Sequence, residues 1–462
     1  MPRTGRQAAA EDPARRRTRR RNALAAVIGS VLEWYDFFLF STSAALVFNK
    51  IFFSGESEFA ATLASFATFA VGFAARPVGG LILAHLGDRW GRKPVLLATV
   101  LLMGASTLAI GVLPTYDQIG IWAPALLVFC RIVQGLGVGA ELAGAYVWTT
   151  ESSTPERRGY YAALPGAGEF LGVVCASGAM AVVSSMDEES FLSWGWRIPY
   201  LASLIVVAAG VVLRYLSEES ETFKNARAEG RTRRTPLVTA VRGHGKRILL
   251  MIGAGCATAV ASYSIQGYLP SYTTQQLGLP PNVAVIAITV ASAVSVLGVP
   301  LCGALSDRVG RRPLIIGGGV AIAAFAFPFW LVVGTGSLPL ITLAVILGFA
   351  VLLNSLIFAP SGSFFSELLP TEVRYSGLVL ARETTAVLFS GTAPFVATLL
   401  VHAAGGTPWL LGGYMALSGL ITAGCVLLLP ETAPRVLRRK GGGQGDEGHG
   451  ASADTDVDRA KV

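Results

Sequence analysis

The sequence predicts an all-α polytopic membrane protein in which twelve transmembrane helices form two pseudo-symmetric six-helix bundles. The chain is 52% hydrophobic and only 14% charged, and its mean hydropathy is +0.56. A water-soluble domain of 462 residues cannot bury that much apolar surface in one core. The apolar residues lie in long runs, and two loop motifs occur once in each half of the chain. Because a bilayer offers the backbone no hydrogen-bond partners, we expect these runs to be helices.

Twelve apolar runs are long enough to cross a bilayer, which takes about 20 residues in a helix. We expect each run to form one transmembrane helix, and the polar gaps between the runs to form loops. The approximate limits are 23–48, 59–86, 95–115, 121–149, 160–184, 196–217, 247–274, 283–305, 314–334, 338–366, 376–402 and 408–430.

Polar segments divide the chain into five parts. A basic N-terminal tail (1–22) precedes an N-terminal six-helix bundle (23–217), and a basic linker (218–246) leads to a C-terminal six-helix bundle (247–430). The tail at 431–462 is rich in Gly, Asp and Ser, and we expect it to be disordered. The first tail has no small-residue cleavage site, so we expect the first apolar run to stay in the membrane.

Basic residues are unevenly distributed among the predicted loops. Every second loop carries clustered arginines, whereas the opposite loops hold little more than Lys50, Asp187, Glu188 and His402. Cytoplasmic loops of membrane proteins carry an excess of Lys and Arg, so an even number of spans with both termini in the cytoplasm satisfies every loop. The net charge of +8 therefore indicates topology in a cell membrane, with lipid as the surrounding partner, and not binding to nucleic acid.

Two loop motifs occur once in each half of the chain. LGDRWGRKPVL at 86–96 returns as LSDRVGRRPLI at 305–315, and ESSTPERRG at 151–159 has the counterpart ELLPTEVRYSG at 367–377. Each motif lies between equivalent apolar runs of its half. The two halves therefore look like one ancestral six-helix unit used twice.

Two six-helix halves, a cytoplasmic linker and the repeated Asp-Arg-x-Gly-Arg motif resemble the major facilitator superfamily. Five further blocks occur in the order typical of its metabolite:proton symporter branch: GSVLEWYDFFLF, ARPVGG, RIVQGLGVGAELAGA, GWRIPYL and LPTEVRYSG. Members of that branch take up organic acids, shikimate or zwitterionic osmolytes, and the resemblance implies a substrate of this kind. One departure is Ala84, since the family motif usually begins with the glycine that the second copy keeps as Gly303.

The repeated loop motifs are expected to form a gate at the cytoplasmic ends of the helices. Glycine permits tight turns and close helix approach, and an aspartate is stabilised near the N-terminus of another helix. The resemblance implies that Asp88 meets the start of the eleventh span and Asp307 the start of the fifth. The alternative is that these charges only set topology and cap helices. The candidate gate residues are Gly87, Asp88, Arg89, Gly91, Arg92, Glu151, Arg158, Asp307, Arg308, Gly310, Arg311, Glu367 and Arg374.

Proton coupling requires a carboxyl group within the membrane whose proton occupancy changes with its surroundings. Glu33 and Asp36 share one face of the first helix. At about 1.5 Å per residue, Asp36 lies roughly 20 Å and Arg131 roughly 27 Å from the cytoplasmic end, so both are central. The resemblance to sugar carriers with an aspartate on the first span and an arginine on the fourth implies that Asp36 and Arg131 are the proton site, with Glu33 as second choice. The alternative is a permanent salt bridge.

Other polar residues within the predicted spans are candidate substrate ligands. Gly267 and Pro270 interrupt the seventh span, where polar side chains would suit a binding wall or an interfacial belt. Arg76 and Glu141 have similar depths, so a structural pair is an equal alternative for them. An inter-helix ion pair is the alternative for the adjacent charges on the eleventh span. The candidates are Arg76, Gln134, Glu141, Glu169, Tyr263, Gln266, Tyr268, Asn354, Arg382 and Glu383.

The sequence lacks the motifs of enzymes. Its four histidines have no metal-ligand spacing, so we expect no metal site, and neither a GxxxxGK[ST] phosphate loop nor a GxSxG nucleophile turn is present. The linker is basic but contains no folded nucleic-acid module. We therefore expect a transporter, not an enzyme, with no nucleic-acid partner.

Three functions remain as hypotheses. The first is uptake of a small carboxylate or zwitterion with protons, in which Arg76, Arg131 and Arg382 are available for a carboxylate. The second is proton-coupled efflux of a hydrophobic or cationic compound, which Glu169 would attract, although LPGAGEFLG does not reproduce the antiporter motif. The third is a sensor that keeps the fold without transporting. We favour the first, driven by the proton gradient without a cofactor and functional as a monomer.

Overall fold

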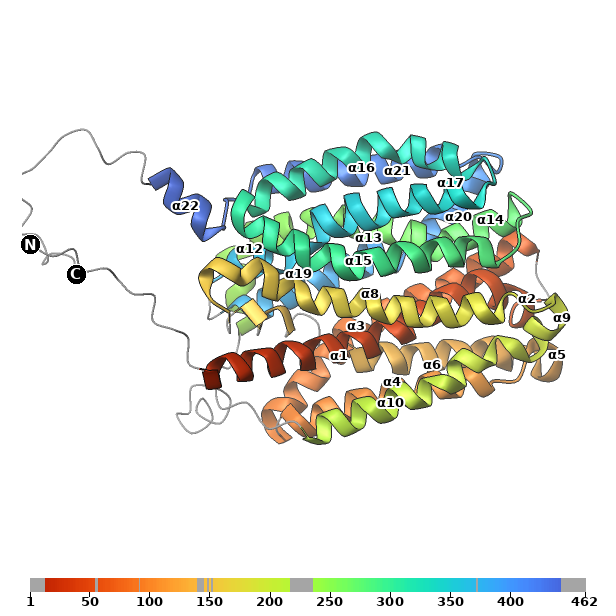
Figure 1. Ribbon diagram of the computed structural model, residues 1–462. Helices are drawn as coiled ribbons and strands as arrows, with labels where there is room; N and C mark the ends of the chain where they lie inside the picture. Colours follow the sequence, from red (N-terminus) through yellow and green to blue (C-terminus); the bar gives the residue numbers. More distant parts are fainter. Residues whose placement is uncertain are drawn as a thin grey trace, which may run out of the picture.

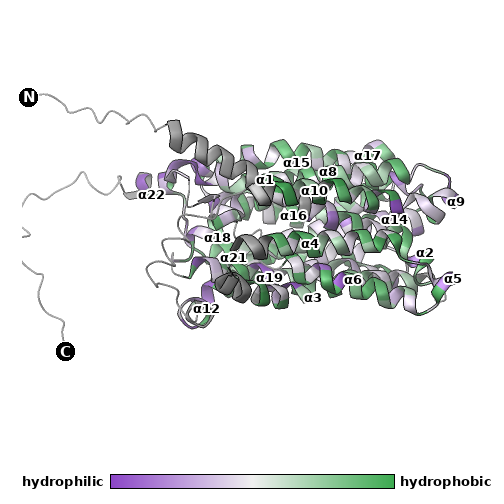
Figure 2. Ribbon diagram, turned by 90° about the horizontal axis from the view of Figure 1, so that it is seen from below, coloured by the Kyte–Doolittle hydropathy of each residue, from purple (hydrophilic) through white to green (hydrophobic). Residues whose placement is uncertain are grey.

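The computed structural model describes residues 13–54, 57–90, 92–138, 145–147, 149–150, 153–216, 236–370 and 373–441. Within these residues the regular secondary structure is helical. Figure 1 shows the long helices aligned along one direction, with the red-to-yellow helices of the first half beside the green-to-blue helices of the second half. Hydrophobic residues predominate along the helices and hydrophilic ones gather at the two ends (Figure 2), as expected for a bundle surrounded by lipid.

The first half consists of six long helical segments joined by short ones. In chain order the long segments are α1 (Pro13–Ser43) with η1 (Ala44–Phe48) and α2 (Asn49–Ile51), α3 (Glu58–Trp90), α4 (Arg92–Val112), α6 (Trp122–Val138), α8 (Arg158–Val183) and α10 (Arg197–Leu216). The connecting helices are α5 (Tyr116–Ile119), η2 (Pro155–Arg157), α9 (Glu188–Ser190) and η3 (Phe191–Gly195).

The second half repeats this arrangement with more interruptions. Its seventh span combines α12 (Pro236–Ala254), α13 (Cys256–Tyr263), η4 (Ser264–Tyr268) and α14 (Leu269–Gln275). Single helices form the eighth, ninth and twelfth spans, which are α15 (Asn282–Val309), α16 (Arg311–Val333) and α21 (Trp409–Leu427). The tenth comprises α17 (Leu338–Val345), η5 (Ile346–Phe358) and α18 (Ala359–Glu367), and the eleventh α19 (Arg374–Thr385), η6 (Ala386–Ser390) and α20 (Ala393–Ala403). Helix α22 (Pro434–Gly441) follows.

The lengths and hydropathies of these helices confirm the predicted fold class. Among the described residues, 9 helices are long and apolar enough to cross a membrane, and the bent pair Glu188–Gly195 and Arg197–Ala209 adds one more. Leu97–Val112 and Trp122–Val138 are shorter apolar helices. Together these segments make up the twelve spans, six in each half, in the predicted order.

Helices extend into three polar segments that were expected to lie outside the bundles. Helix α1 begins at Pro13, inside the basic tail, and α12 begins at Pro236, inside the linker. Helix α22 begins at Pro434, so the expectation that the chain is disordered from residue 431 is wrong for this helix. Proline is favourable in the first turn of a helix, where its missing N–H group has no intrahelical partner to lose. All three helices start with it.

The two halves approach most closely where α8 contacts α15. A Cβ on Gly303 would lie 2.6 Å from the carbonyl oxygen of Gly159 and 2.6 Å from Cβ of Ala163. Asp307 Oδ1 accepts a hydrogen bond from the backbone N–H of Gly159 over 2.8 Å, and its Oδ2 accepts one from Tyr160 over 3.2 Å. The predicted position of Asp307 at the start of the fifth span is thus confirmed. The start of α1 and helix α22 lie at this same end of the bundle (Figure 1), which we call the motif end.

The halves also contact each other at the opposite end of the bundle. Gln275 Nε2 of α14 donates to Thr62 Oγ1 of α3 over 2.8 Å. The rings of Phe59 and His402, on α3 and α20, are stacked with their centres 3.8 Å apart. The two halves therefore contact each other at both ends of the bundle.

Replacing Gly303 by leucine is expected to destabilise the protein by about 1–3 kcal/mol, because the added side chain would overlap the backbone of α8. Gly317→Leu on α16 is the matched control, since a Cβ there meets no atom within 4 Å. Thermal unfolding of the purified protein in detergent measures both variants. Equal unfolding midpoints for the two would contradict the close approach of α8 and α15.

Candidate functional site

A cavity of about 120 Å³ lies between the two halves. The first half lines it with Trp34, Phe73, Arg76, Tyr146, Glu169 and Phe170. From the second half, η4, η5 and η6 each contribute a polar side chain, namely Gln266, Asn354 and Ser390. Such π-helical turns are often found at functional sites, and ligand sites are common at interfaces between structural halves. This cavity is therefore the candidate substrate site.

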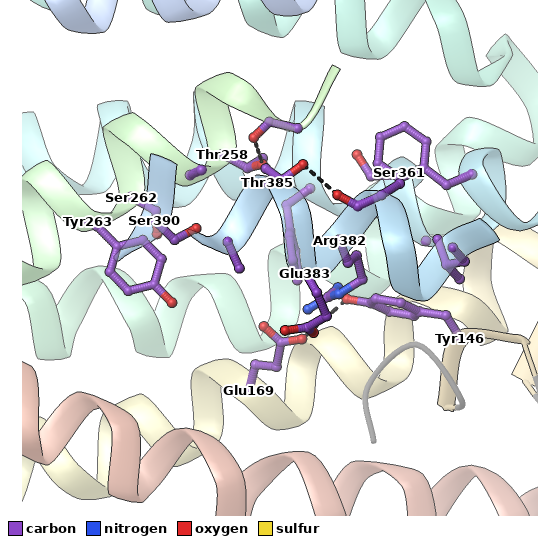
Figure 3. Close-up of a pocket in the computed structure, with 18 of the residues that line it drawn as sticks. Tyr146, Glu169, Thr258, Ser262, Tyr263, Ser361, Arg382, Glu383, Thr385 and Ser390 are labelled. Carbon is purple, nitrogen blue, oxygen red and sulfur yellow. Dashed lines mark hydrogen bonds between the residues drawn. The ribbon is translucent and has the colours of Figure 1, made fainter. Parts of the chain in front are cut away.

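Opposite charges face each other across one side of the cavity. Glu169 of α8 and Arg382 of α19 both lie on its wall, with Tyr146 beside them (Figure 3). The Tyr146 hydroxyl donates to Glu169 Oε1 over 3.2 Å, and the Arg382 guanidinium carbon lies 5.2 Å from the centre of the Tyr146 ring. Among the described residues, no carboxylate oxygen comes within 4.0 Å of Arg382. Within the part of the chain that the structure describes, the Arg382 guanidinium thus faces the cavity beside Tyr146 without a carboxylate in ion-pair distance.

Arg76 is held between two carboxylates from different halves. Its Nη2 lies 3.3 Å from Glu33 Oε1 of α1, and its Nε lies 3.2 Å from Glu383 Oε2 of α19. The guanidinium group also stands over the rings of Phe37 and Phe73, 5.4 and 5.5 Å from their centres. All three charged side chains are buried. The inter-helix ion pair considered for the eleventh span is thus present, with Arg76 as the partner of Glu383.

Asp36 lies in a hydrogen-bond network inside the first half. Thr107 Oγ1 donates to Asp36 Oδ1, and Gln134 Nε2 donates to Asp36 Oδ2. A cavity of about 30 Å³, separate from the central one, adjoins Asp36, Glu33 and Thr107. The two hydrogen bonds connect the Asp36 carboxyl group to α4 and α6, and the group is buried away from lipid.

The expected contact between Asp36 and Arg131 is indirect. Arg131 Nη1 donates to Gln134 Oε1, and it is the Gln134 amide that reaches Asp36. Gln134 follows Arg131 by one turn of α6, so both side chains point the same way and the shorter amide fits between the charges. The Arg131 guanidinium carbon stands over the rings of Phe37 and Phe40, 4.4 and 4.2 Å from their centres. In this structure the Gln134 amide links the two groups, and the role of Arg131 as a switchable partner of Asp36 stays a prediction.

Seven of the ten proposed substrate ligands line the central cavity. They are Arg76, Glu169, Tyr263, Gln266, Asn354, Arg382 and Glu383. Gln134 instead belongs to the Asp36 network, and Tyr268 packs with its ring 6.3 Å from Phe66. Glu141 lies outside the described residues, so its suggested pairing with Arg76 stays a prediction.

Charges of the second motif copy form a compact cluster at the motif end. The Arg311 side chain is 0% exposed, and its Nη1 lies 2.9 Å from Asp307 Oδ1. Its Nε and Nη2 each lie 3.2 Å from a carboxylate oxygen of Glu367. Arg158 Nη1, from the first half, lies 3.9 Å from Glu367. The cluster therefore joins the two halves beside the contact of α8 with α15.

The remaining gate candidates contribute in different ways. Gly310 has a φ of 114°, which glycine adopts more readily than other residues, and it separates α15 from α16. Arg308 is exposed, and Arg374 Nε donates to the carbonyl of Leu369 over 3.3 Å. The first-copy residues lie where side chains or whole residues are not described, so their gate role stays a prediction: Gly87, Asp88, Arg89, Gly91, Arg92 and Glu151.

Several residues of these sites escaped the sequence analysis, and Tyr146 and Glu431 are two examples. Tyr146 bridges the charges of the cavity, but a tyrosine near a predicted helix end is also typical of a membrane interface. Glu431 accepts the backbone N–H groups of Arg311 and Arg312 over 3.0 and 3.1 Å, capping α16 from the far end of the second half. The sequence did offer one signal for Glu431, because it is an acidic residue next to a stretch that is otherwise basic.

Comparisons with known proteins agree with this architecture. The family model described as Major Facilitator Superfamily matches residues 26–385. The chain is 35% identical to the shikimate transporter of Escherichia coli over 416 residues, which is 89% of this chain and 95% of the relative. It is 34% identical to the proline/betaine transporter of the same species over 435 residues, 91% of this chain and 85% of the relative.

Solved structures show the same fold at lower sequence identity. The xylose transporter of Escherichia coli, in a partially occluded inward-open conformation, superposes with a TM-score of 0.70 at 20% identity, covering 90% of this chain and 98% of the other. Families and relatives of this kind are transporters, not enzymes. With the helical repeat, the central cavity and the motif-end cluster, these matches show that the chain belongs to the major facilitator superfamily of multi-pass membrane transporters.

Proposed function

We propose that this protein takes up a small carboxylate-bearing or zwitterionic metabolite together with protons. Arg382 is the observation that carries the proposal. It lines the central cavity and has no carboxylate within 4.0 Å among the described residues, whereas Arg76 is already paired with two. A guanidinium group binds a carboxylate through parallel hydrogen bonds, and a desolvated cavity strengthens that interaction.

The names of the relatives support a substrate of this class. Shikimate is a hydroxylated carboxylate, and proline and betaine are zwitterions that carry a carboxylate. The aromatic rings of Trp34, Phe73 and Tyr263 on the cavity wall suit the apolar or cationic remainder of such molecules. The alternative of cation efflux would use Glu169 as the primary ligand and would give the Arg382 guanidinium no part in binding, so uptake of a carboxylate is favoured.

Proton coupling is assigned to the Asp36 network. Asp36 is buried. Its hydrogen-bond donors are Thr107 of α4 and Gln134 of α6, and Arg131 of α6 donates a hydrogen bond to Gln134. A shift of Gln134 would bring Arg131 closer to Asp36 or move it away, and either change alters how strongly the carboxyl group binds a proton. The small cavity adjoins Asp36 and Thr107, so the carboxyl group itself also has space to move.

Alternating access follows from the repeated halves. The cluster around Arg311 and Glu367 would close the motif end while the other end opens, and the contacts of Thr62 with Gln275 would do the reverse. We place the motif end and both termini in the cytoplasm, because the basic loops lie there. The cycle needs only substrate and the proton gradient, with no cofactor, and each chain contains a complete site, so we expect a functional monomer.

Asp36→Asn is expected to lower proton-driven uptake more than tenfold while substrate exchange stays within about twofold of wild type, because an amide cannot release a proton. Proteoliposomes with a panel of shikimate, proline and glycine betaine measure both activities. Asp117→Asn in the exposed helix α5 is the matched control and should behave as wild type. Proton exit driven by a cationic compound would support the efflux alternative instead.

Arg382→Lys is expected to raise the KM for uptake about tenfold or more, since lysine keeps the charge but loses the planar pair of donors. Arg242→Lys on the exposed part of α12 is the matched control. Transport measured against substrate concentration gives KM and kcat for each variant. A change confined to kcat would show that Arg382 does not bind substrate in the ground state.

A further inference from the structure

Glu169 differs from Glu33 and Glu383, the other described carboxyl groups near the central cavity. Its side chain is 1% exposed and faces the central cavity. Glu33 and Glu383 are both paired with Arg76, but no Lys, Arg or His nitrogen of the described residues lies within 4.0 Å of Glu169. Its hydrogen bond comes from the Tyr146 hydroxyl. A carboxylate without a close cation is costly in such surroundings.

Charged groups from several helices surround Glu169. Arg382 and Glu383 face it from α19, Glu33 from α1 and Arg76 from α3, and all of them except Glu33 also line the central cavity. Because Arg76 is balanced by its two carboxylates, Arg382 is the principal positive charge acting on Glu169. Tyr146 contacts both residues and holds them on the same side of the cavity.

Asp36 does not occupy the same space as the substrate site. It adjoins the small cavity beside α4, whereas the central cavity is lined by Glu169 and Arg382. A proton on Asp36 therefore acts on the substrate only through movements of the protein. A proton on Glu169 acts on it directly.

We propose that Glu169 is a second proton-binding group, which takes up its proton when a substrate carboxylate binds Arg382. This inference rests on the proposed function. In the empty cavity the positive charge of Arg382 stabilises the Glu169 carboxylate. A substrate carboxylate neutralises that charge, and Glu169 then binds a proton. In the empty cavity the charges of Arg382 and Glu169 sum to zero, and with an anionic substrate the charges of Arg382, protonated Glu169 and the substrate carboxylate also sum to zero, so the exchange adds no uncompensated charge to the cavity.

Two consequences follow from this exchange of partners. Substrate and proton bind cooperatively, because by linkage each raises the affinity for the other by the same factor. Each transport cycle also carries two protons, one on Asp36 and one on Glu169. Both consequences are measurable without knowledge of the natural substrate, provided that one member of the panel is carried.

The first test is the accumulation ratio at equilibrium in proteoliposomes with the membrane voltage held at zero. For a pH difference of one unit, two coupled protons support about 100-fold accumulation and one proton about tenfold. With shikimate, proline and glycine betaine as probes, we expect about 100-fold for wild type and about tenfold for Glu169→Gln. The matched control, Glu189→Gln in the exposed helix α9, should match wild type.

The outcomes separate the inference from the proposed function. A ratio near 100 in Glu169→Gln, or a ratio near ten in wild type, would overturn the role of Glu169 and leave symport intact. No proton-driven accumulation of any probe by wild type would overturn the proposed function itself. An accumulation ratio that falls only in Glu169→Gln supports the inference.

A second measurement covers the case in which Glu169→Gln folds but does not transport. Binding of the same probe to purified protein is expected to tighten about tenfold from pH 8 to pH 6 in wild type and Glu169→Asp, because protonation of this group favours the bound state. Binding to Glu169→Gln should be tight and independent of pH. An unchanged pH dependence in Glu169→Gln would overturn the proposal.

Discussion

The cost of placing a charge inside a bilayer determines how the centre of this protein is built. Arg76 is the clearest case, because its guanidinium group is held within 3.3 Å of Glu33 and 3.2 Å of Glu383. A buried guanidinium without any carboxylate partner would be far more costly than a lost surface ion pair, and Arg76 has a partner on each side. Since Glu33 and Arg76 belong to the first half and Glu383 to the second, this requirement also holds the two halves together. The Arg382 guanidinium also lines this cavity and is the group that we propose to bind the substrate.

The two halves keep the same helices but use their charges differently. At the motif end the second copy of the loop motif places Arg311 between Asp307 and Glu367, and Arg158 of the first half joins the same cluster. In the centre, by contrast, Asp36 and Glu169 come from the first half and Arg382 from the second. A duplicated unit therefore supplies a charged cluster that is shared by both halves, while the proposed proton-binding groups and the proposed substrate-binding group lie on opposite sides of their interface.

Much of the fold could be predicted from the sequence, because the runs of apolar residues and the basic loops follow directly from the thickness and the sidedness of a membrane. Positions along single helices were predicted as well: Asp307 meets the start of α8, and Arg382 and Glu169 face the cavity. Pairings between helices could not be predicted. Depth and the resemblance to sugar carriers made Arg131 a partner of Asp36, but in the structure Gln134 lies between them. Arg76 was assigned no partner on the eleventh span, since nothing in one sequence shows which helices are neighbours across the interface.

The position of each inter-half contact determines which contacts can break during transport. If the halves rock as rigid bodies, atoms near the pivot move little, whereas atoms at the ends of the bundle move by several ångströms. The pairs of Arg311 with Glu367 and of Gln275 with Thr62 lie at the two ends, so each must form and break once in a cycle. Arg76 and Glu383 line the central cavity, close to where a pivot must be. Their ion pair can persist while both ends open in turn, and a buried pair that never separates never exposes its charges to lipid. In the proposed cycle the contacts that break are therefore confined to the ends of the bundle, where water can replace the lost partner, while the ion pairs of Arg76 at the centre stay intact.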